Sequence, residues 1–148
     1  MQADMIATVH VACPKCLAEN RIPAERASEG PKCGQCGAPL LAGAPIELDE
    51  QSFDTFLRRT SLPVLVDFWA PWCGPCRAMA PAFEAAAREH ASQVCFVKVN
   101  TDEAQDLAAR MAIRAIPSLM LFKGGREAAR SSGAMDARSL ARWIAQHA

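Results

Sequence analysis

The sequence predicts an α/β domain with a mixed central sheet and helices on both faces, preceded by a small cysteine-rich module. Three observations support this prediction. Helix-like and strand-like patterns alternate from about residue 46 onward, and the run over residues 62–70, apolar with almost no alternation except at Asp67, suits a strand buried on both faces. Four of the seven cysteines lie in the first 45 residues as two Cys-x-x-Cys pairs. We therefore expect two units, residues 1–45 and residues 46–148.

The composition is typical of a globular protein and argues against several functions. Of the 148 residues, 51% are hydrophobic, and 16 basic residues balance 16 acidic ones. This balance offers no basic field for nucleic acid, and no apolar stretch is long enough to span a membrane. The first ten residues have no positive segment and no long apolar core, so we expect no signal peptide. Cysteines without an export signal favour a reducing compartment, and we expect a cytoplasmic monomer.

The N-terminal module has the cysteine spacing of a zinc ribbon. Its two Cys-x-x-Cys turns, 13–16 and 33–36, are separated by sixteen residues. Each turn presents two thiolates on one side of a tight loop, and two such turns complete a closed tetrahedral shell of four sulfurs. A module with so little apolar core needs a cross-link, which in a reducing compartment is usually a metal. We therefore predict one structural zinc ion, held by Cys13, Cys16, Cys33 and Cys36. The alternative is that these pairs form disulfides or further redox centres.

Three other features of the module are less informative. His10 lies near the first cysteine but is surplus to a site with four sulfurs, so we expect it on the surface of a strand. Residues 19–23 have the mixed polarity of a hairpin arm. Residues 39–45 have the composition of a linker or turn.

The sequence of the second unit predicts a series of helices and strands. Phe53, Phe56 and Leu57 are spaced as one face of a helix, which Ser52 could cap. The further elements follow in chain order: strand 62–70, helix 77–90, strand 94–99, helix 102–111, strand 119–122, a turn at Gly124-Gly125, strand 126–131 and helix 136–146.

A third Cys-x-x-Cys pair, Cys73 and Cys76, lies between the strand 62–70 and the helix that follows it. This arrangement places Cys73 at a helix N-terminus, where the helix dipole and unpaired N–H groups favour a thiolate. The two cysteines can close a short disulfide, with Cys73 as the attacking sulfur. A metal half-site or a structural disulfide is the alternative. The context favours a thiol–disulfide site.

Two single residues in the predicted strands have side chains that could take part in a reaction, Asp67 and Cys95. Asp67 is a carboxylate inside a buried strand, where its pKa should rise and suit it to proton transfer near neutral pH. The alternative is an Asp wetted by solvent at a strand end. Cys95 is unpaired, and we interpret it as a small buried hydrophobe rather than a reactive thiol.

The run of residues 66–76, with the sequence VDFWAPWCGPC, resembles the active-site signature of thioredoxins. The likeness covers residues 46–148, and the N-terminal pairs resemble the zinc-ribbon-bearing thioredoxin 2 type. The resemblance implies the thioredoxin fold, a role for Asp67 in serving Cys76, and a position for Lys98 near that carboxylate. It also implies a cis Ile116–Pro117 bond and an apolar substrate-docking surface made of Trp72, Pro75, Ile116, Pro117 and Gly133. Ser131 and Ser132 depart from the residues more usual there, which leaves substrate preference open.

The implied activity is reduction of protein disulfides. Cys73 attacks a substrate sulfur, and Cys76 then resolves the mixed disulfide with help from Asp67. The Gly-Pro pair between the cysteines resembles that of reductants. NADPH would supply electrons through thioredoxin reductase, the expected partner beside disulfide-containing proteins. The alternatives are a disulfide isomerase or oxidase, and a zinc-ribbon adaptor or holdase with an ancillary redox domain. Oxidation of the zinc thiolates could also make the ribbon redox-sensitive.

Overall fold

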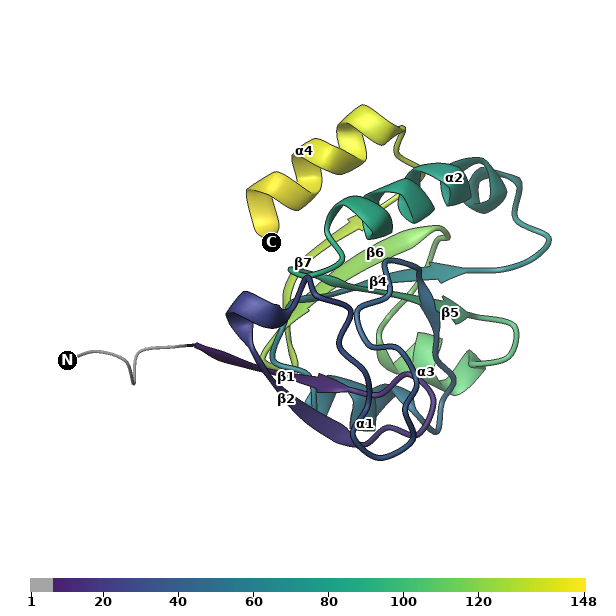
Figure 1. Cartoon of the computed structure of the whole chain (residues 1–148). Helices are drawn as coiled ribbons and strands as arrows, with labels where there is room; N and C mark the ends of the chain where they lie inside the picture. Colours follow the sequence, from purple (N-terminus) through teal and green to yellow (C-terminus); the bar gives the residue numbers. More distant parts are fainter. Residues whose placement is uncertain (1–6) are drawn as a thin grey trace.

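The computed structural model describes residues 7–148, which form two sheets (Figure 1). The smaller sheet is a hairpin of β1 (Thr8–Ala12) and β2 (Glu19–Pro23), followed by the short 3₁₀ helix η2 (Ala24–Arg26). The expected hairpin arm at residues 19–23 is confirmed. Residues 1–6, on which part of the signal-peptide expectation rests, lie outside the described residues.

The larger sheet is mixed, as predicted, and has the strand order β3-β5-β4-β6-β7. Strands β3, β4 and β5 are parallel, whereas β6 is antiparallel to both β4 and β7. Its strands are β3 (Ile46–Glu47), β4 (Val64–Trp69), β5 (Cys95–Asn100), β6 (Ser118–Lys123) and β7 (Arg126–Ser132). The pattern analysis missed β3 because two residues are too few to show a period.

Helices cover both faces of this sheet. They are α1 (Phe53–Arg58), α2 (Gly74–Glu89), α3 (Gln105–Arg110) and α4 (Ala137–His147). Helices α2 and α4 lie on one face, while α1, α3 and the β1–β2 hairpin lie on the other (Figure 1). Among residues 7–148, no helix combines the length and apolarity needed to cross a membrane.

Strand β4 is buried on both faces because its side chains alternate between two cores. Val64, Val66 and Phe68 face the core shared with α1, whereas Leu65 packs against Met79 and Phe83 of α2. The absence of polar alternation in the sequence is thereby explained. By the same alternation, Asp67 shares the α2 face of the sheet with Leu65.

The N-terminal module is docked on the second unit through backbone and side-chain hydrogen bonds. The His10 carbonyl accepts from the Ser61 N–H (2.8 Å), and the His10 N–H donates to the Ser61 hydroxyl (2.8 Å). In the buried part of the junction, the Ala12 N–H donates to the Thr60 hydroxyl (3.1 Å). The apolar residues Val11, Ile22 and Leu40 of the module also share one core with Phe53 and Phe56 of α1. The boundary at residue 45 stays a prediction.

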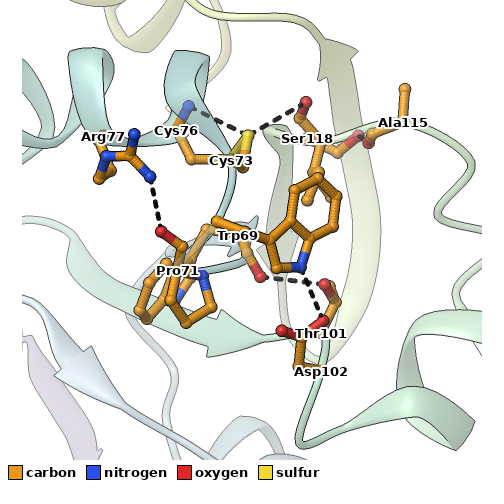
Figure 2. The surroundings of a disulfide bond; sticks show 11 residues. Trp69, Pro71, Cys73, Cys76, Arg77, Thr101, Asp102, Ala115 and Ser118 are labelled. Atoms are coloured by element: carbon orange, nitrogen blue, oxygen red, sulfur yellow. Dashed lines mark hydrogen bonds between the residues drawn. A yellow bond between two sulfur atoms is a disulfide. The ribbon is translucent and has the colours of Figure 1, made fainter.

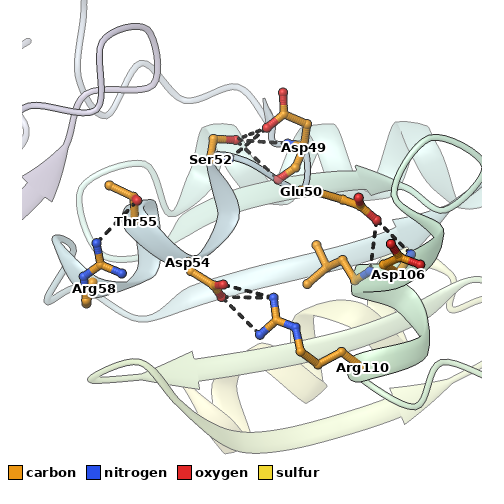
Figure 3. A network of polar contacts seen from close by, with 9 residues as sticks. Asp49, Glu50, Ser52, Asp54, Thr55, Arg58, Asp106 and Arg110 are labelled. Carbon is orange, nitrogen blue, oxygen red and sulfur yellow. Dashed lines mark hydrogen bonds and ion pairs between the residues drawn. The ribbon is translucent and has the colours of Figure 1, made fainter.

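Ser52 immediately precedes α1, but its side chain does not cap the helix, so this prediction was wrong. Its hydroxyl instead donates to the Asp49 carboxylate (2.8 Å), which also accepts from the Ser52 N–H (2.8 Å) (Figure 3). The reason is the backbone of Ser52, which has φ −96° and ψ −20°. A capping side chain needs an extended backbone to reach back to the first turn, and this conformation is helical.

Helix α3 is capped from outside its own segment. Its preceding residue, Ala104, has no capping group, and the Glu50 carboxylate accepts from the N–H groups of Asp106 (2.8 Å) and Leu107 (3.1 Å) (Figure 3). We expect Glu50→Ala to lower the free energy of unfolding by about 1 kcal/mol, because it leaves two helix donors without a partner. Urea unfolding measures the change.

Arg110→Gln is the control for Glu50→Ala. Arg110 makes an ion pair with Asp54 (3.0 Å), but both side chains are about half exposed, at 52% and 54%. Exposed ion pairs contribute about 0–1 kcal/mol, so we expect a smaller loss than at Glu50. Equal stability of Glu50→Ala and wild type would contradict the capping role.

Candidate active site and metal centre

Cys73 and Cys76 are joined in a disulfide at the point where β4 gives way to α2, with Cα atoms 5.3 Å apart. The turn after β4 is closed by the Cys73 N–H, which donates to the Ala70 carbonyl (3.1 Å). Helix α2 begins at Gly74, earlier than the predicted residue 77, because Cys73 itself is its N-cap. The predicted strand–turn–helix context is therefore confirmed.

The surroundings of Cys73 favour negative charge on its sulfur. Its Sγ accepts a hydrogen bond from the Cys76 N–H (3.2 Å) and lies 3.8 Å from the Ile116 carbonyl oxygen (Figure 2). Its extended backbone, with φ −82° and ψ 112°, is the conformation of a helix cap. Helix α2 is 16 residues long, and the positive end of its dipole points at this sulfur. In the dithiol state the Cys76 N–H and the helix dipole stabilise a thiolate at Cys73, whereas the Ile116 carbonyl oxygen, an acceptor, does not.

The two sulfurs differ in access rather than in average exposure. The Cys73 and Cys76 residues are 4% and 3% exposed. Cys73, however, lines an open groove of about 510 Å³, which Cys76 does not reach. An incoming sulfur atom therefore meets Cys73 first.

The groove contains three of the five predicted docking residues, Trp72, Pro75 and Ile116. Trp72 is 67% exposed, and its Nε1 donates to the Asp102 carboxylate (3.1 Å), which fixes the ring at the groove edge.

Pro117 and Gly133 lie beside the groove rather than in its wall. Pro117 is buried, and its carbonyl accepts from the Gly133 N–H (2.9 Å). The Ile116–Pro117 bond is cis, as the resemblance implied. The groove also includes residues that sequence reasoning missed, such as Thr101, Ile113 and Arg114. They come from loops that carry no periodic signal, so only the fold brings them to the cysteines.

Asp67 is buried, as predicted, with only 1% of its surface exposed. Its Oδ1 has no hydrogen-bond partner within the described part of the chain. Burial raises the pKa of this carboxyl from 3.8 to about 7; Lys98 partly offsets the rise and Glu47 adds to it. Asp67 faces the α2 layer, whose first turn holds Cys76. The solvent-wetted alternative is excluded, and the part of Asp67 in proton transfer stays a prediction.

Lys98 is in register with Asp67 on the neighbouring strand β5, as the resemblance implied. The two side chains form no ion pair within 4.0 Å, and the Lys98 Nζ instead lies 4.3 Å from the centre of the Trp69 ring. Lys98 therefore acts on Asp67 at longer range, which leaves desolvation as the dominant influence on its pKa.

The raised pKa of Asp67 predicts a pH-dependent cost to stability. In the unfolded chain Asp67 ionises near pH 3.8, whereas in the fold it ionises near pH 7. Between these values the folded state holds the extra proton, so stability falls as pH rises through this window and levels off above it. We expect Asp67→Asn to be more stable than wild type at pH 8, by up to about 4 kcal/mol, and this gain should shrink progressively towards pH 5.

Urea unfolding at pH 5, 6.5 and 8 measures this gain. Glu103→Gln, which removes an exposed carboxylate, is the control and should show no such pH-dependent gain. A constant stability difference between Asp67→Asn and wild type across the three pH values would contradict the raised pKa.

The four N-terminal cysteines converge, and their sulfur atoms all lie within 4.8 Å of one another. The Cys13–Cys36 and Cys16–Cys33 sulfur pairs are each 3.6 Å apart. Four sulfurs bound tetrahedrally at 2.3 Å from zinc lie roughly 3.8 Å from one another. The donor set and its spacing therefore fit a closed zinc site.

The two Cys-x-x-Cys turns have matching backbone geometry. The Cys13 carbonyl accepts from the Leu17 N–H, and the Cys33 carbonyl accepts from the Gly37 N–H, both at 2.9 Å. Leu17 and Gly37 both have positive φ, 65° and 79°, which turns the chain back after each pair. Backbone N–H groups also point at the sulfurs. Those of Cys36 and Gln35, together with the Asn20 side chain, lower the pKa of the Cys33 thiol from 9.0 to about 6.

Asn20 connects the two turns, a role that no sequence pattern indicated. Its Oδ1 accepts from the Gly34 N–H (2.9 Å), while its Nδ2 donates to the Ala18 carbonyl (3.1 Å). His10 is not part of the sulfur cluster. Its ring Nδ1 lies 2.6 Å from the Glu19 carboxylate in the β1–β2 hairpin, which confirms it as a strand surface residue.

Cys95 lies in β5 and is buried, as predicted. Burial raises the pKa of its thiol to about 12. The thiol is therefore protonated at neutral pH and is a poor nucleophile.

Comparison with known proteins identifies the family. The family model described as Thioredoxin matches residues 44–146, which is most of the chain. The chain belongs to the thioredoxin family. A second model, described as Thioredoxin 2, N-terminal, matches residues 12–38 and so contains all four clustered cysteines. The chain is thus of the zinc-ribbon-bearing thioredoxin 2 type.

Characterised thioredoxins align over most of their length. Thioredoxin C-3 of Corynebacterium nephridii is 43% identical over 136 residues, covering 92% of this chain and 93% of that protein. Thioredoxin 1 of Synechococcus elongatus is 45% identical over 98 residues, covering 66% and 92%. Thioredoxin of Haemophilus influenzae is 39% identical over 102 residues, covering 69% and 95%. With the Cys73–Cys76 disulfide, this kinship makes the chain a thiol–disulfide oxidoreductase.

Proposed function

We propose that this thioredoxin is a protein-disulfide reductase, with Cys73 as the attacking and Cys76 as the resolving cysteine. The observation that carries the proposal is the position of Cys73. Its sulfur caps α2, accepts the Cys76 N–H and lines the open groove, while Cys76 is enclosed behind it. This arrangement supplies a thiolate and a way for a substrate sulfur to reach it.

The reaction has two exchange steps. The Cys73 thiolate attacks one sulfur of the substrate disulfide, so a Cys73–substrate bond forms, the substrate S–S bond breaks, and the released thiolate takes a proton from water. The Cys76 thiolate then attacks the Cys73 sulfur, so the Cys73–Cys76 bond forms, the Cys73–substrate bond breaks, and the second released thiolate takes a proton from water. Two electrons have then passed to the substrate. Asp67, with its pKa near 7, accepts the Cys76 proton in the second step.

Substrate binding uses the apolar rim of the groove. Trp72, Pro75 and Ile116 contact the polypeptide next to the scissile disulfide, and Pro117 and Gly133 shape the neighbouring backbone. An extended substrate segment can pair with the backbone at Ile116, in the manner of an added strand. The exposed Trp72 ring supplies most of the apolar area for such a contact.

Two further parts of the function are the regeneration of the Cys73–Cys76 dithiol and the metal bound by the N-terminal module. Thioredoxin reductase returns the disulfide to the dithiol with electrons from NADPH, and the protein works as a monomer in the reducing cytoplasm. One structural zinc ion is held by Cys13, Cys16, Cys33 and Cys36 and cross-links the N-terminal module when bound. The sulfur cluster and the match to the thioredoxin 2 N-terminal model support this assignment.

The direction of the reaction is tested by equilibrating the Cys73–Cys76 pair with glutathione. We expect a potential near −270 mV, the value known for thioredoxins, rather than about −180 mV for a disulfide isomerase or −120 mV for an oxidase. A potential above about −200 mV would overturn the reductase proposal in favour of the isomerase or oxidase. Oxidation of NADPH by thioredoxin reductase, measured with this protein and a disulfide substrate, tests the electron source.

A further inference from the structure

A second groove, which we call the junction groove, lies between the zinc-ribbon module and the C-terminal unit. It has a volume of about 690 Å³ and is lined mainly by residues 57–61, residues 124–126, and His10 and Glu19 of the β1–β2 hairpin. Residues 57–61 lead from α1 towards β4, and residues 124–126 include the β6–β7 turn. The module is docked against the first of these segments through Thr60 and Ser61, and the groove is lined jointly by the module and both segments.

The junction groove and the redox disulfide lie at opposite ends of the central sheet. Strand β4 is antiparallel to β6, with Val64 opposite Phe122 at the groove end and Phe68 opposite Ser118 at the disulfide end. Six residues of strand separate the two ends by roughly 20 Å. A partner long enough to span the sheet can touch both sites at once.

The free charge in the junction groove is positive. Of its two carboxylates, Asp54 is compensated by the Arg110 guanidinium 3.0 Å away, whereas Glu19 is hydrogen-bonded to the His10 ring (2.6 Å) and contributes one negative charge. Three guanidinium groups also line it, those of Arg58, Arg59 and Arg126. Within residues 7–148 none of these three makes an ion pair.

The three guanidinium groups differ in their contacts and in how available they are to a ligand. Arg59 donates to the Leu17 carbonyl (2.8 Å) and so helps to hold the module in place. Arg58 makes only a long contact with the Thr55 hydroxyl (3.5 Å), and Arg126 begins the edge strand β7. Arg58 and Arg126 are exposed, so their donors are available to a ligand. This local charge stands out in a chain whose formal net charge is zero.

We propose that the junction groove docks an acidic segment of a partner protein whose disulfide is presented to Cys73. The proposal rests on the proposed function in taking the partner to be a protein whose disulfide is reduced at Cys73. Guanidinium groups bind carboxylates through paired hydrogen bonds, which matches this wall of the groove. Among the described residues no Phe, Tyr or Trp lines the groove, and its one ring, that of His10, is held by Glu19, so the groove offers no series of stacking positions for nucleic-acid bases. Its volume also suits several linked groups rather than one small anion.

Attachment at two points has a kinetic consequence. Once the acidic segment is bound, the disulfide of the same partner stays close to Cys73 and its effective concentration there rises. Opposite charges also speed the first encounter, and salt weakens both effects. Partners with an acidic segment at a suitable distance from their disulfide are therefore preferred.

The test measures binding without any redox step. A fluorescent hexaglutamate peptide lacking cysteine is titrated with the full-length protein in its disulfide form, at an ionic strength of about 10 mM, where charges act over about 30 Å. We expect Arg58→Gln/Arg126→Gln to weaken binding roughly five-fold, since two exposed guanidinium–carboxylate contacts are lost. Arg59 is left unchanged because it holds the module in place.

The control is Arg138→Gln/Arg142→Gln, which removes the same charge from the exposed face of α4 and should leave binding unchanged. Equal weakening by both double variants, or no binding by wild type, would overturn the proposal. Displacement of the peptide by a lower concentration of tripolyphosphate would also overturn it, because the groove would then be a phosphate site. The peptide undergoes no exchange reaction, so failure here is distinct from failure of the reductase proposal.

Discussion

Cys73→Ser is expected to lower the rate of disulfide reduction by at least about 10³-fold. The sulfur at this position caps α2 and faces the groove, and a serine hydroxyl supplies no anionic nucleophile there at neutral pH. The measurement is turnover of a disulfide-containing protein with thioredoxin reductase and NADPH. Retention of full cellular and partner-binding function by Cys73→Ser would instead support an adaptor or holdase.

Cys76→Ser should stop the reaction one step later. Cys73 can still attack, but nothing resolves the mixed disulfide, so a covalent complex of one substrate per protein should accumulate and be visible by intact mass. Cys95→Ala is the matched control and should turn over like wild type, because that thiol is buried and protonated. A stable complex formed through Cys76 in the Cys73→Ser variant would reverse the assigned roles.

Loss of zinc is expected to have the largest effect on stability. Zinc binding in isolated zinc fingers contributes about 10–16 kcal/mol, so Cys33→Ser, which breaks the four-sulfur set, should release the metal and unfold the β1–β2 hairpin. Because Val11, Ile22 and Leu40 share a core with α1, the second unit should also lose stability, by several kcal/mol. Metal analysis and amide hydrogen exchange measure the two effects.

Wild-type protein purified without oxygen should carry one zinc per chain, and mild peroxide then distinguishes two roles for the site. Zinc that survives oxidation of the Cys73–Cys76 pair makes the ribbon structural, whereas zinc lost as thiols disappear makes it redox-sensitive. Protein that contains no zinc and has disulfides in its place would contradict the metal assignment. That result would not affect the assignment of redox chemistry to Cys73 and Cys76.

Features that depend on neighbours in the chain could be predicted from the sequence. The strand–turn–helix context of Cys73, the burial of Asp67 and the convergence of the four N-terminal cysteines each follow from a short spacing and the local polarity around it. These patterns are reliable because a short stretch of chain contains the whole signal, the longest being the two cysteine pairs within residues 13–36. The mixed sheet followed from the order of the elements in the same way.

The tertiary structure alone decided features that join distant segments. Glu50 caps a helix that begins more than fifty residues later, and Ser52 fails as a cap because its backbone is helical. Strand β3 exists only as a partner of β5, and the junction groove is lined jointly by the module, which is bonded to the Thr60 and Ser61 hydroxyls, and by the β6–β7 turn. No local sequence pattern predicts these contacts. They arise because burying the shared apolar core brings these segments together, and the hydrogen bonds and charges at their edges then acquire partners or remain free.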